Sequence, residues 1–332
     1  MEHVHGLGAE GASVPPAARF APGEILEALE VGPRVGGPLD ALRAVAFHAA
    51  NFAAVARPGR VDRILWGMAQ VLRAGRLVAK DPSLRRAAIV PTALTFAGCA
   101  ALAALVTADR FTDGDPGNAL ATFHVFLVAF VAVASMPPTL LHRMWVRVAL
   151  ESRHALALGP AEDPWAGLGY ARLLWREGRK VLRQGLLVSA GLFPVLAMVR
   201  LLPWGAAEAA ALAAVWAFYW IVVDALELPI EVVPGPPPPA PEPWFVRLLL
   251  AAPTPLLWPL RLSGRLAGRL ARPWREEVSF TERHPWEAAG FALAAGALLV
   301  LPGLGLFFRS VAIAAATAMH GALEERSGPT GA

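Results

Sequence analysis

Two acidic residues stand at the end of one of the most apolar stretches of the chain. Asp224 and Glu227 follow the run VWAFYWIVV (215–223) and lie three positions apart, so on a helix they share one face. Carboxylates on an apolar helix are costly in lipid and typically mark a proton or cation site. The alternative is a helix end that reaches water and pairs with an arginine. We therefore take Asp224 and Glu227 as a candidate proton or cation site, with that structural role as its competitor.

Histidines offer further candidates for proton transfer or metal binding. His124 and His142 bracket another long apolar stretch, where a histidine can relay protons or simply pack at the membrane interface. His3 and His5 form a His-x-His pair that could bind a metal weakly, or could belong to a free tail. Neither pattern supplies a full set of ligands. We expect no metal site and no cofactor.

Enzyme motifs are missing from the chain. There is no G-x-S-x-G elbow, no H-E-x-x-H, no P-loop and no Cys-x-x-Cys. Glu276 and Glu277, followed by His284, partly match an intramembrane glutamate/histidine protease, but they share one polar segment instead of lying on separate apolar helices. The single cysteine, Cys99, excludes a disulfide framework and a multi-cysteine metal site. The sequence predicts a protein that is not an enzyme.

The amino-acid composition indicates the class of fold in which these residues lie. Of the 332 residues, 56% are hydrophobic and only 17% charged, with a mean hydropathy of +0.48. A soluble protein carries about a quarter charged residues. This composition therefore predicts an all-α integral membrane protein.

Two uncharged stretches are long enough to cross a bilayer. Residues 87–108 and 117–141 each exceed the roughly 20 helical residues that a crossing requires. Asp81 followed by Pro82 is a favourable helix start, with Asp as N-cap and Pro at the first helical position. We predict two full transmembrane helices at about 82–108 and 116–150.

Two further apolar regions are each broken in the middle. Residues 184–228 and 287–323 are pairs of apolar runs joined by proline and glycine, and they predict helical hairpins. The arm 288–301 would be only about 21 Å long, which is short of the roughly 30 Å hydrocarbon core. We expect that these hairpins only partly penetrate the bilayer, although their length leaves a full crossing of 184–228 open.

The positive charges are segregated to one side of these spans. Arginine and lysine gather before the first span, between the second span and the first hairpin, and in 224–287, whereas the intervening turns hold at most one each. This is the positive-inside pattern, and it places both termini in the cytoplasm. The net charge of +4 is thereby an orientation signal, and we expect no nucleic-acid partner.

The segments between the spans complete the predicted organisation. Residues 64–80 and 171–183 read as basic amphipathic helices at the cytoplasmic interface. After a polyproline spacer, arginines recur at helical spacing from Arg261 to Arg272, which favours a helix on the lipid surface over a nucleic-acid site. The predicted parts are a disordered N-terminal tail (1–40), a first membrane part (41–233), a Pro/Arg-rich amphipathic cytoplasmic insertion (234–283), a C-terminal membrane hairpin (284–323) and a C-terminal tail (324–332).

Taken in order, these pieces resemble the CysZ sulfate permease family and its wider relatives, the etoposide-induced-protein family. The pieces are the basic helix leading through Asp81-Pro82 and Arg85-Arg86 to Pro91, the kinked span with Met136-Pro137-Pro138, the run from Trp216 to Asp224, and the closing GFALAAGALLVLPGLGLFFRSVAIAAATAMHG. The resemblance implies an inner-membrane permease with two full spans and two partly inserted hairpins. It also implies sulfate as substrate and a homo-oligomer, a dimer or higher.

The resemblance also implies an anion-binding position. Family members carry a Gly-[Leu/Trp]-[Arg/Lys] motif in the first helical region, and the nearest match here is Gly75-Arg76-Leu77, in which the basic residue follows the glycine directly. Arg73 on the same helix and Arg309 near a hairpin tip are further candidates. A glycine exposes backbone N–H groups and a guanidinium offers paired donors to a tetrahedral anion. The alternative is that the arginines before the first span only orient the protein in the membrane.

Two functions follow from this sequence. The first is a CysZ-like permease for a small inorganic anion, with sulfate the first to test and membrane lipid around it. The second is a non-transporting membrane scaffold that uses its Pro/Arg-rich insertion to bind lipid or a partner.

Overall fold

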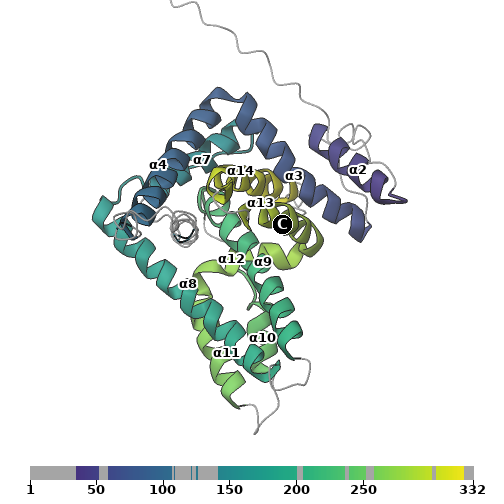
Figure 1. Ribbon diagram of the computed structural model, residues 1–332, viewed down its shortest axis with the longest axis vertical. Helices are drawn as coiled ribbons and strands as arrows, with labels where there is room; N and C mark the ends of the chain where they lie inside the picture. The colour runs from purple at the N-terminus through teal and green to yellow at the C-terminus, as the bar shows by residue number, and fades with distance from the viewer. Residues whose placement is uncertain are drawn as a thin grey trace, which may run out of the picture.

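The computed structural model describes residues 35–51, 59–106, 108, 121, 125, 141–199, 205–235, 239–251, 258–300 and 304–324. Within these ranges the protein is helical and has no strand, which confirms the all-α prediction. The elements are α2 (Pro38–Ala50), α3 (Arg60–Lys80), α4 (Pro82–Val106), α7 (His142–Ala155), α8 (Tyr170–Val199), α9 (Gly205–Glu231), α10 (Trp244–Leu250), α11 (Trp258–Leu270), the 3-10 turn η3 (Arg272–Trp274), α12 (Arg275–Arg283), α13 (Pro285–Val300) and α14 (Leu304–Glu324). Figure 1 shows α13 and α14 at the centre of the molecule, with α3, α4, α7 and α8 around them.

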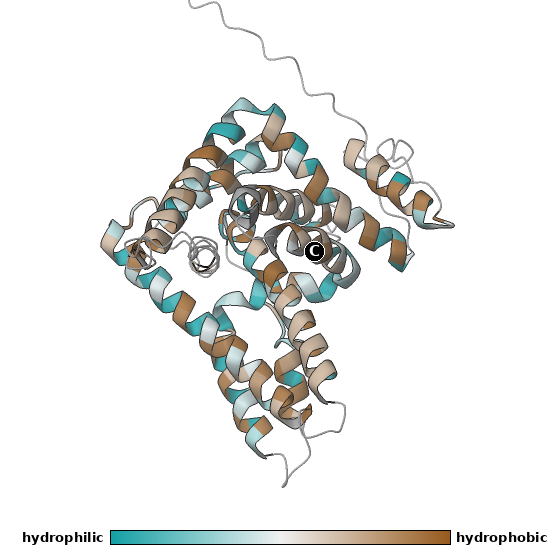
Figure 2. Cartoon of the chain, viewed as in Figure 1, coloured by the Kyte–Doolittle hydropathy of each residue, from teal (hydrophilic) through white to brown (hydrophobic). Residues whose placement is uncertain are grey.

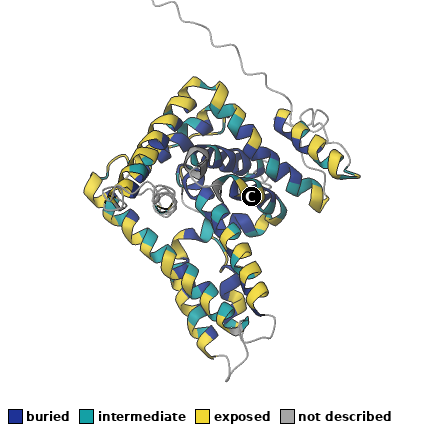
Figure 3. Ribbon diagram, in the orientation of Figure 1, coloured by how far each residue is buried: buried dark blue, intermediate teal, exposed yellow. Residues whose placement is uncertain are grey.

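The centre is a close packing of α3, α9, α13 and α14. Its buried side chains include Trp66, Leu226, Phe291 and Met319, and Figure 3 shows the buried residues concentrated on these helices. Alanine fills much of α14, where Ala312, Ala314, Ala315, Ala316 and Ala318 are all buried. Small side chains let the neighbouring helices approach closely. The predicted helix at 64–80 is present within α3; Val71 and Val78 pack in the cluster with α13 and α14, Leu65 packs against α2, and Leu72 is exposed.

Glycines bring α3 and α13 into direct contact. A Cβ added at Gly290 would lie 1.9 Å from the carbonyl oxygen of Ile64, and one added at Gly67 would lie 2.1 Å from that of Glu287. Beside this crossing, Arg63 Nε donates to Glu287 Oε1 at 2.5 Å. Both glycines are therefore needed for the two backbones to touch.

Among the residues that the structure describes, three helices are long and apolar enough to cross a membrane. They are the segments Pro82–Leu105 in α4, Tyr170–Ala197 in α8 and Gly205–Glu231, which is α9. Hydrophobic colours dominate α4 and α9 in Figure 2. The exposed side chains of α4 include Ile89, Val90, Leu94 and Leu105. Such an apolar surface suits lipid, and the chain is a membrane protein.

The structure tests the predicted membrane segments to different extents. The first span matches α4, and its predicted N-cap is confirmed because Leu84 N–H donates to Asp81 Oδ1 at 2.7 Å. The second lies outside the described residues except for two isolated positions and its end, where 141–150 lead into α7. The amphipathic segment 171–183 and the apolar arm after it form one continuous helix, α8.

The segment between Pro234 and Arg283 packs against α8 and α9. Phe245, Ala267 and Trp274 from this segment share a buried cluster with Leu187 of α8 and Trp216 of α9. In Figure 1, α10 and α11 lie beside the lower halves of α8 and α9.

A polar contact fixes the same packing. Arg183 of α8 donates to the carbonyl oxygens of Leu270 (3.1 Å) and Arg269 (2.5 Å) at the C-terminal end of α11. A cation at the end of a helix satisfies its last carbonyl groups. The insertion is therefore part of the packed body of the protein.

Candidate functional site

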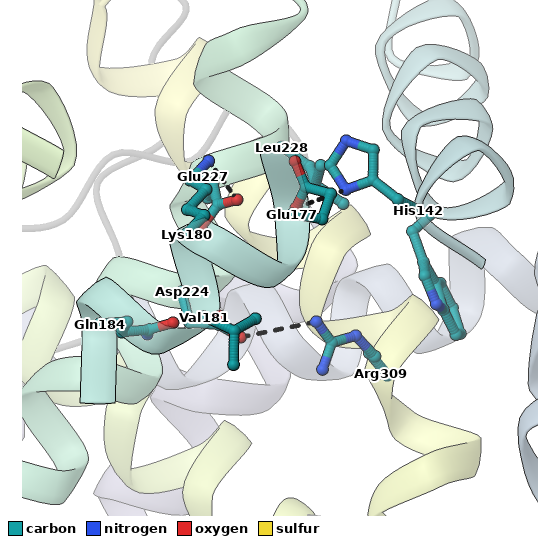
Figure 4. Close-up of a pocket in the computed structure, with 10 residues that line it drawn as sticks. His142, Glu177, Lys180, Val181, Gln184, Asp224, Glu227, Leu228 and Arg309 are labelled. Carbon is teal, nitrogen blue, oxygen red and sulfur yellow. Dashed lines mark ion pairs between the residues drawn. The ribbon is translucent and has the colours of Figure 1, made fainter. Parts of the chain in front are cut away.

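Ionisable side chains from four helices converge on one pocket, here called the polar pocket. It is a cavity of about 40 Å³ between α7, α8, α9 and α14. Its lining residues are His142, Trp145, Glu177, Lys180, Val181, Gln184, Asp224, Glu227, Leu228 and Arg309. Figure 4 shows their arrangement. Intramembrane or near-membrane clusters of this kind usually have a function, because burying charge among apolar helices is costly.

Lys180 holds the centre of the charge network. Its Nζ lies 2.5 Å from Glu227 Oε1 and 2.8 Å from Glu231 Oε1, and the Lys180 side chain is only 11% exposed. The other carboxylate oxygen of Glu227 accepts a hydrogen bond from the indole N–H of Trp274 at 3.3 Å. Arg176 Nη2 also lies 3.8 Å from Glu231 Oε1, so loss of Lys180 would remove the cation from Glu227 and leave Glu231 with Arg176 alone.

The deepest part of the pocket holds His142 and Glu177. His142 Nδ1 lies 3.3 Å from Glu177 Oε2, and the two side chains are 7% and 6% exposed. Figure 4 shows Glu177 of α8 facing the imidazole of His142 on α7. This contact joins α7 to the rest of the charge network.

The open end of the pocket holds Arg309 and Asp224. Arg309 Nη2 lies 3.7 Å from Asp224 Oδ2, which is too long for a hydrogen bond. The guanidinium carbon of Arg309 lies 5.7 Å from the ring centre of Trp145, within the range of a cation–π contact. Arg309 is thus held near the carboxylate while its hydrogen-bonding capacity is left largely unused.

Several buried polar atoms around the pocket make no hydrogen bond within the described part of the chain. They are Arg309 Nε, Trp145 Nε1, His142 Nε2 and Glu177 Oε1. Buried polar atoms in native proteins are nearly always paired with protein, water or a ligand. A cavity of about 40 Å³ has room for roughly three water molecules or one small ion. The polar pocket therefore has room for a small polar ligand and carries unpaired polar atoms that could bind it.

The structure brings four of the candidate residues together. Asp224, Glu227, Arg309 and His142 all line the polar pocket. Asp224 lies 3.7 Å from Arg309, as in the arginine pairing that we gave as the structural alternative, whereas Glu227 pairs with Lys180 and is buried instead of reaching water. The same carboxylates nevertheless face a cavity, so the structural role does not replace the functional one.

The other predicted anion-binding residues lie elsewhere. Arg73 is buried in α3, where its Nη1 donates to Gln70 Oε1 at 3.2 Å. Arg76 is exposed. Gly75 lies against α14, since an added Cβ would be 4.0 Å from Val311. None of the three lines the polar pocket.

The remaining candidates are the glutamates and histidines considered for proteolysis or metal binding. No group of three or more His, Cys, Asp or Glu residues there could hold a metal ion. Glu277 is buried in α12, and burial raises the pKa of its carboxyl well above the usual range. His284 packs its ring 5.0 Å from that of Phe280. His3, His5 and His124 lie outside the described residues.

Glu177, Lys180 and Gln184 were missed by the sequence reasoning. They are spaced i, i+3 and i+7, and so share one face of α8. Asp224, Glu227 and Glu231 have the same spacing on α9, and the two polar faces meet in the structure. The sequence signal for the polar pocket was therefore the matching polar stripes of two helices, and the acidic pair Asp224 and Glu227 is only part of it.

No protein-family model matches the chain, and no curated protein or solved structure matches it either.

Proposed function

We propose that the chain is a permease for a small inorganic anion, with sulfate the first candidate and the polar pocket as its binding site. The observation that carries the proposal is the set of unpaired buried donors around that pocket. The indole N–H of Trp145 and the Nε–H of Arg309 can only donate, and neither has a partner among the described residues. An acceptor-only guest such as an oxyanion would satisfy both.

The charges of the pocket set a condition for anion entry. Three carboxylates, Glu177, Asp224 and Glu227, face two permanent cations, Lys180 and Arg309, so an unprotonated pocket carries a formal excess of one negative charge when His142 is neutral. Protonation of one carboxyl removes this excess. We therefore propose that a proton enters the pocket with the anion, and that Asp224 competes with the anion for Arg309 when it is ionised.

The same proposal includes a topology. The protein lies in the inner membrane with both termini in the cytoplasm, as the positive-inside pattern favours. Residues 82–108 and 116–150 span it fully, and the hairpins 184–228 and 287–323 enter from the cytoplasmic side. This topology would put the polar pocket toward the cytoplasmic ends of α8 and α9.

Uptake of radiolabelled sulfate by proteoliposomes tests the proposal. Losing one charge-assisted hydrogen bond costs about 1.5–3 kcal/mol, so we expect Arg309→Gln to weaken sulfate binding roughly 10- to 100-fold. Arg265→Gln is the matched control, because Arg265 is exposed on α11 and does not line the pocket. Wild-type uptake no higher than that of empty liposomes would exclude a sulfate permease, and normal uptake by Arg309→Gln would move the site away from the pocket.

The excess of carboxylates favours a second candidate, a proton or cation pathway through Asp224 and Glu227 without an anion. The same liposomes distinguish the two when they carry an internal pH indicator. With an anion permease, the liposome interior takes up sulfate and becomes acidic only when sulfate is present. With a proton pathway, the internal pH changes in response to a pH gradient in sulfate-free buffer.

A further inference from the structure

A second and larger cavity lies apart from the polar pocket, between α9, α10, α12 and α13. It has a volume of about 600 Å³ and is here called the apolar cavity. Its lining residues are Val215, Phe218, Tyr219, Val222, Trp244, Arg247, Thr281, Glu282, Pro285, Ala288, Ala289, Ala292 and Leu293. A volume of this size is typical of sites for small organic ligands.

The long walls of the cavity are apolar. Val215, Phe218 and Val222 come from α9, a candidate span, and the alanines at 288, 289 and 292 come from α13. Because alanine is small, these positions leave the space hollow. The stretch of α13 from Pro285 to Leu293 would be about 12 Å long. At its far end Val215 and Leu293 are exposed, so the cavity opens onto an apolar surface.

The near end of the cavity carries one charge of each sign. Arg247 Nη2 of α10 lies 3.1 Å from Glu282 Oε2 of α12. The other oxygen of Glu282 accepts a hydrogen bond from the backbone N–H of Trp244 at 2.7 Å. The Arg247 side chain is 60% exposed, and Trp244 is also exposed. Tryptophan beside charged groups at the end of an apolar helix is typical of the membrane interface.

We propose that the apolar cavity binds one membrane phospholipid with a phosphoethanolamine headgroup. The apolar walls and the charged end of the cavity correspond to the acyl chain and the headgroup of such a lipid. An acyl chain lies between α9 and α13, the phosphate meets Arg247, and the primary ammonium meets Glu282. A carboxylate at this position repels a purely anionic headgroup, and a choline headgroup has no N–H to donate to it. The paired charges therefore select the headgroup, and the alanine-lined wall accepts the chain.

Lipid exchange followed by native mass spectrometry tests the proposal. Purified protein in detergent is mixed with vesicles of phosphatidylethanolamine, phosphatidylglycerol or phosphatidylcholine, and the lipids that remain bound are counted. We expect one retained phosphatidylethanolamine, preferred about tenfold over each of the others. Ala289→Phe should place a ring in the path of the acyl chain between α9 and α13 and abolish retention. Ala297→Phe is the matched control, because Ala297 is exposed on the same helix and does not line the cavity.

A second variant tests headgroup selection. Glu282→Gln keeps an oxygen for the Trp244 N–H but leaves Arg247 without its anion, so the preference should shift from phosphatidylethanolamine to phosphatidylglycerol. A wild-type protein that retains the three lipids equally overturns the proposal. So does retention by Ala289→Phe, equal loss in both phenylalanine variants, or an unchanged preference in Glu282→Gln. The exchange with Glu282→Gln decides the outcome if Ala289→Phe does not fold.

Discussion

Replacing Gly290 with alanine tests the crossing of α3 and α13 at the centre of the protein. The added Cβ would lie 1.9 Å from the carbonyl oxygen of Ile64, where ordinary contact requires at least 3.4 Å. The obstacle is backbone, so no side-chain rotation relieves it, and the two helices must separate by about 1.5 Å. A radial gap of 0.5–1 Å already forfeits about a quarter to a half of each dispersion contact.

The expected magnitude follows from two opposing effects. Overpacking typically costs about 1–3 kcal/mol, and a rigid backbone obstacle puts this site at the upper end. Alanine recovers about 1 kcal/mol because it is a better helix former than glycine. The net destabilisation should be about 2 kcal/mol. At about 2–4 °C per kcal/mol for a chain of this size class, the apparent Tm should fall by about 4–8 °C.

Thermal unfolding in detergent, followed by tryptophan fluorescence, measures this change. Trp66 lies in the same core and is one of the eleven tryptophans that contribute to the signal. Gly98→Ala in α4 is the matched control, since nothing lies within 4 Å of the added Cβ there. That variant should keep or slightly raise the Tm. If Gly290→Ala behaves like the control, α3 and α13 do not meet through their backbones and the reasoning is refuted.

Three further predictions concern the charge network and the topology. Lys180→Met removes the cation from Glu227 and leaves Glu231 with Arg176 alone, 3.8 Å away, and should destabilise the protein by about 3–5 kcal/mol; an unchanged Tm would mean that the carboxylates are already neutral. Glu277→Gln should raise the Tm more at pH 8 than at pH 5, because a raised pKa in the folded state makes stability fall as the pH rises above the usual carboxyl range. Equal gains at both pH values would contradict this. A cysteine at Leu304, in a background without the native cysteine, should resist thiol labelling from the far side of the membrane, and labelling there would show that the last hairpin crosses fully.

The sequence was sufficient for some of the helices, such as α4, but not for the helices they pack against. Uncharged length predicted α4, and Asp81 followed by Pro82 marked its start, because both signals are local. The crossing at Gly290 has no such signal. A glycine inside an apolar run reads only as a weak point in a helix until another backbone is placed against it.

The Pro/Arg-rich segment illustrates the same limit in a different way. Arginines at helical spacing indicated an exposed amphipathic helix, and Arg265 and Arg269 are indeed exposed on α11. The opposite face, with Ala267 and its neighbour Gly264, is what packs against the rest of the protein. Small residues contribute little to hydropathy. The arginine-dominated sequence of α11 therefore gave no indication that one side of the helix is buried. Deleting 234–283 would therefore remove Phe245, Ala267 and Trp274 from the buried cluster and expose Leu187 and Trp216, so the deletion could not separate a scaffold function from a loss of packing.

The polar pocket could have been found from the chain alone by comparing helices instead of reading them singly. The polar residues of α8 and those of α9 each recur at i, i+3 and i+7, and each stripe would be costly in an apolar environment on its own. Two such stripes lower that cost only if they face one another, which fixes the rotation of both helices about their axes. Opposite charges at Lys180 and Glu227 then fix the register along the axes. What no periodicity supplies is Arg309, which reaches the pocket from α14 at the other end of the sequence. The sequence marked Arg309 as a candidate for anion binding, but only the tertiary structure places it in the polar pocket, where its Nε has no partner among the described residues.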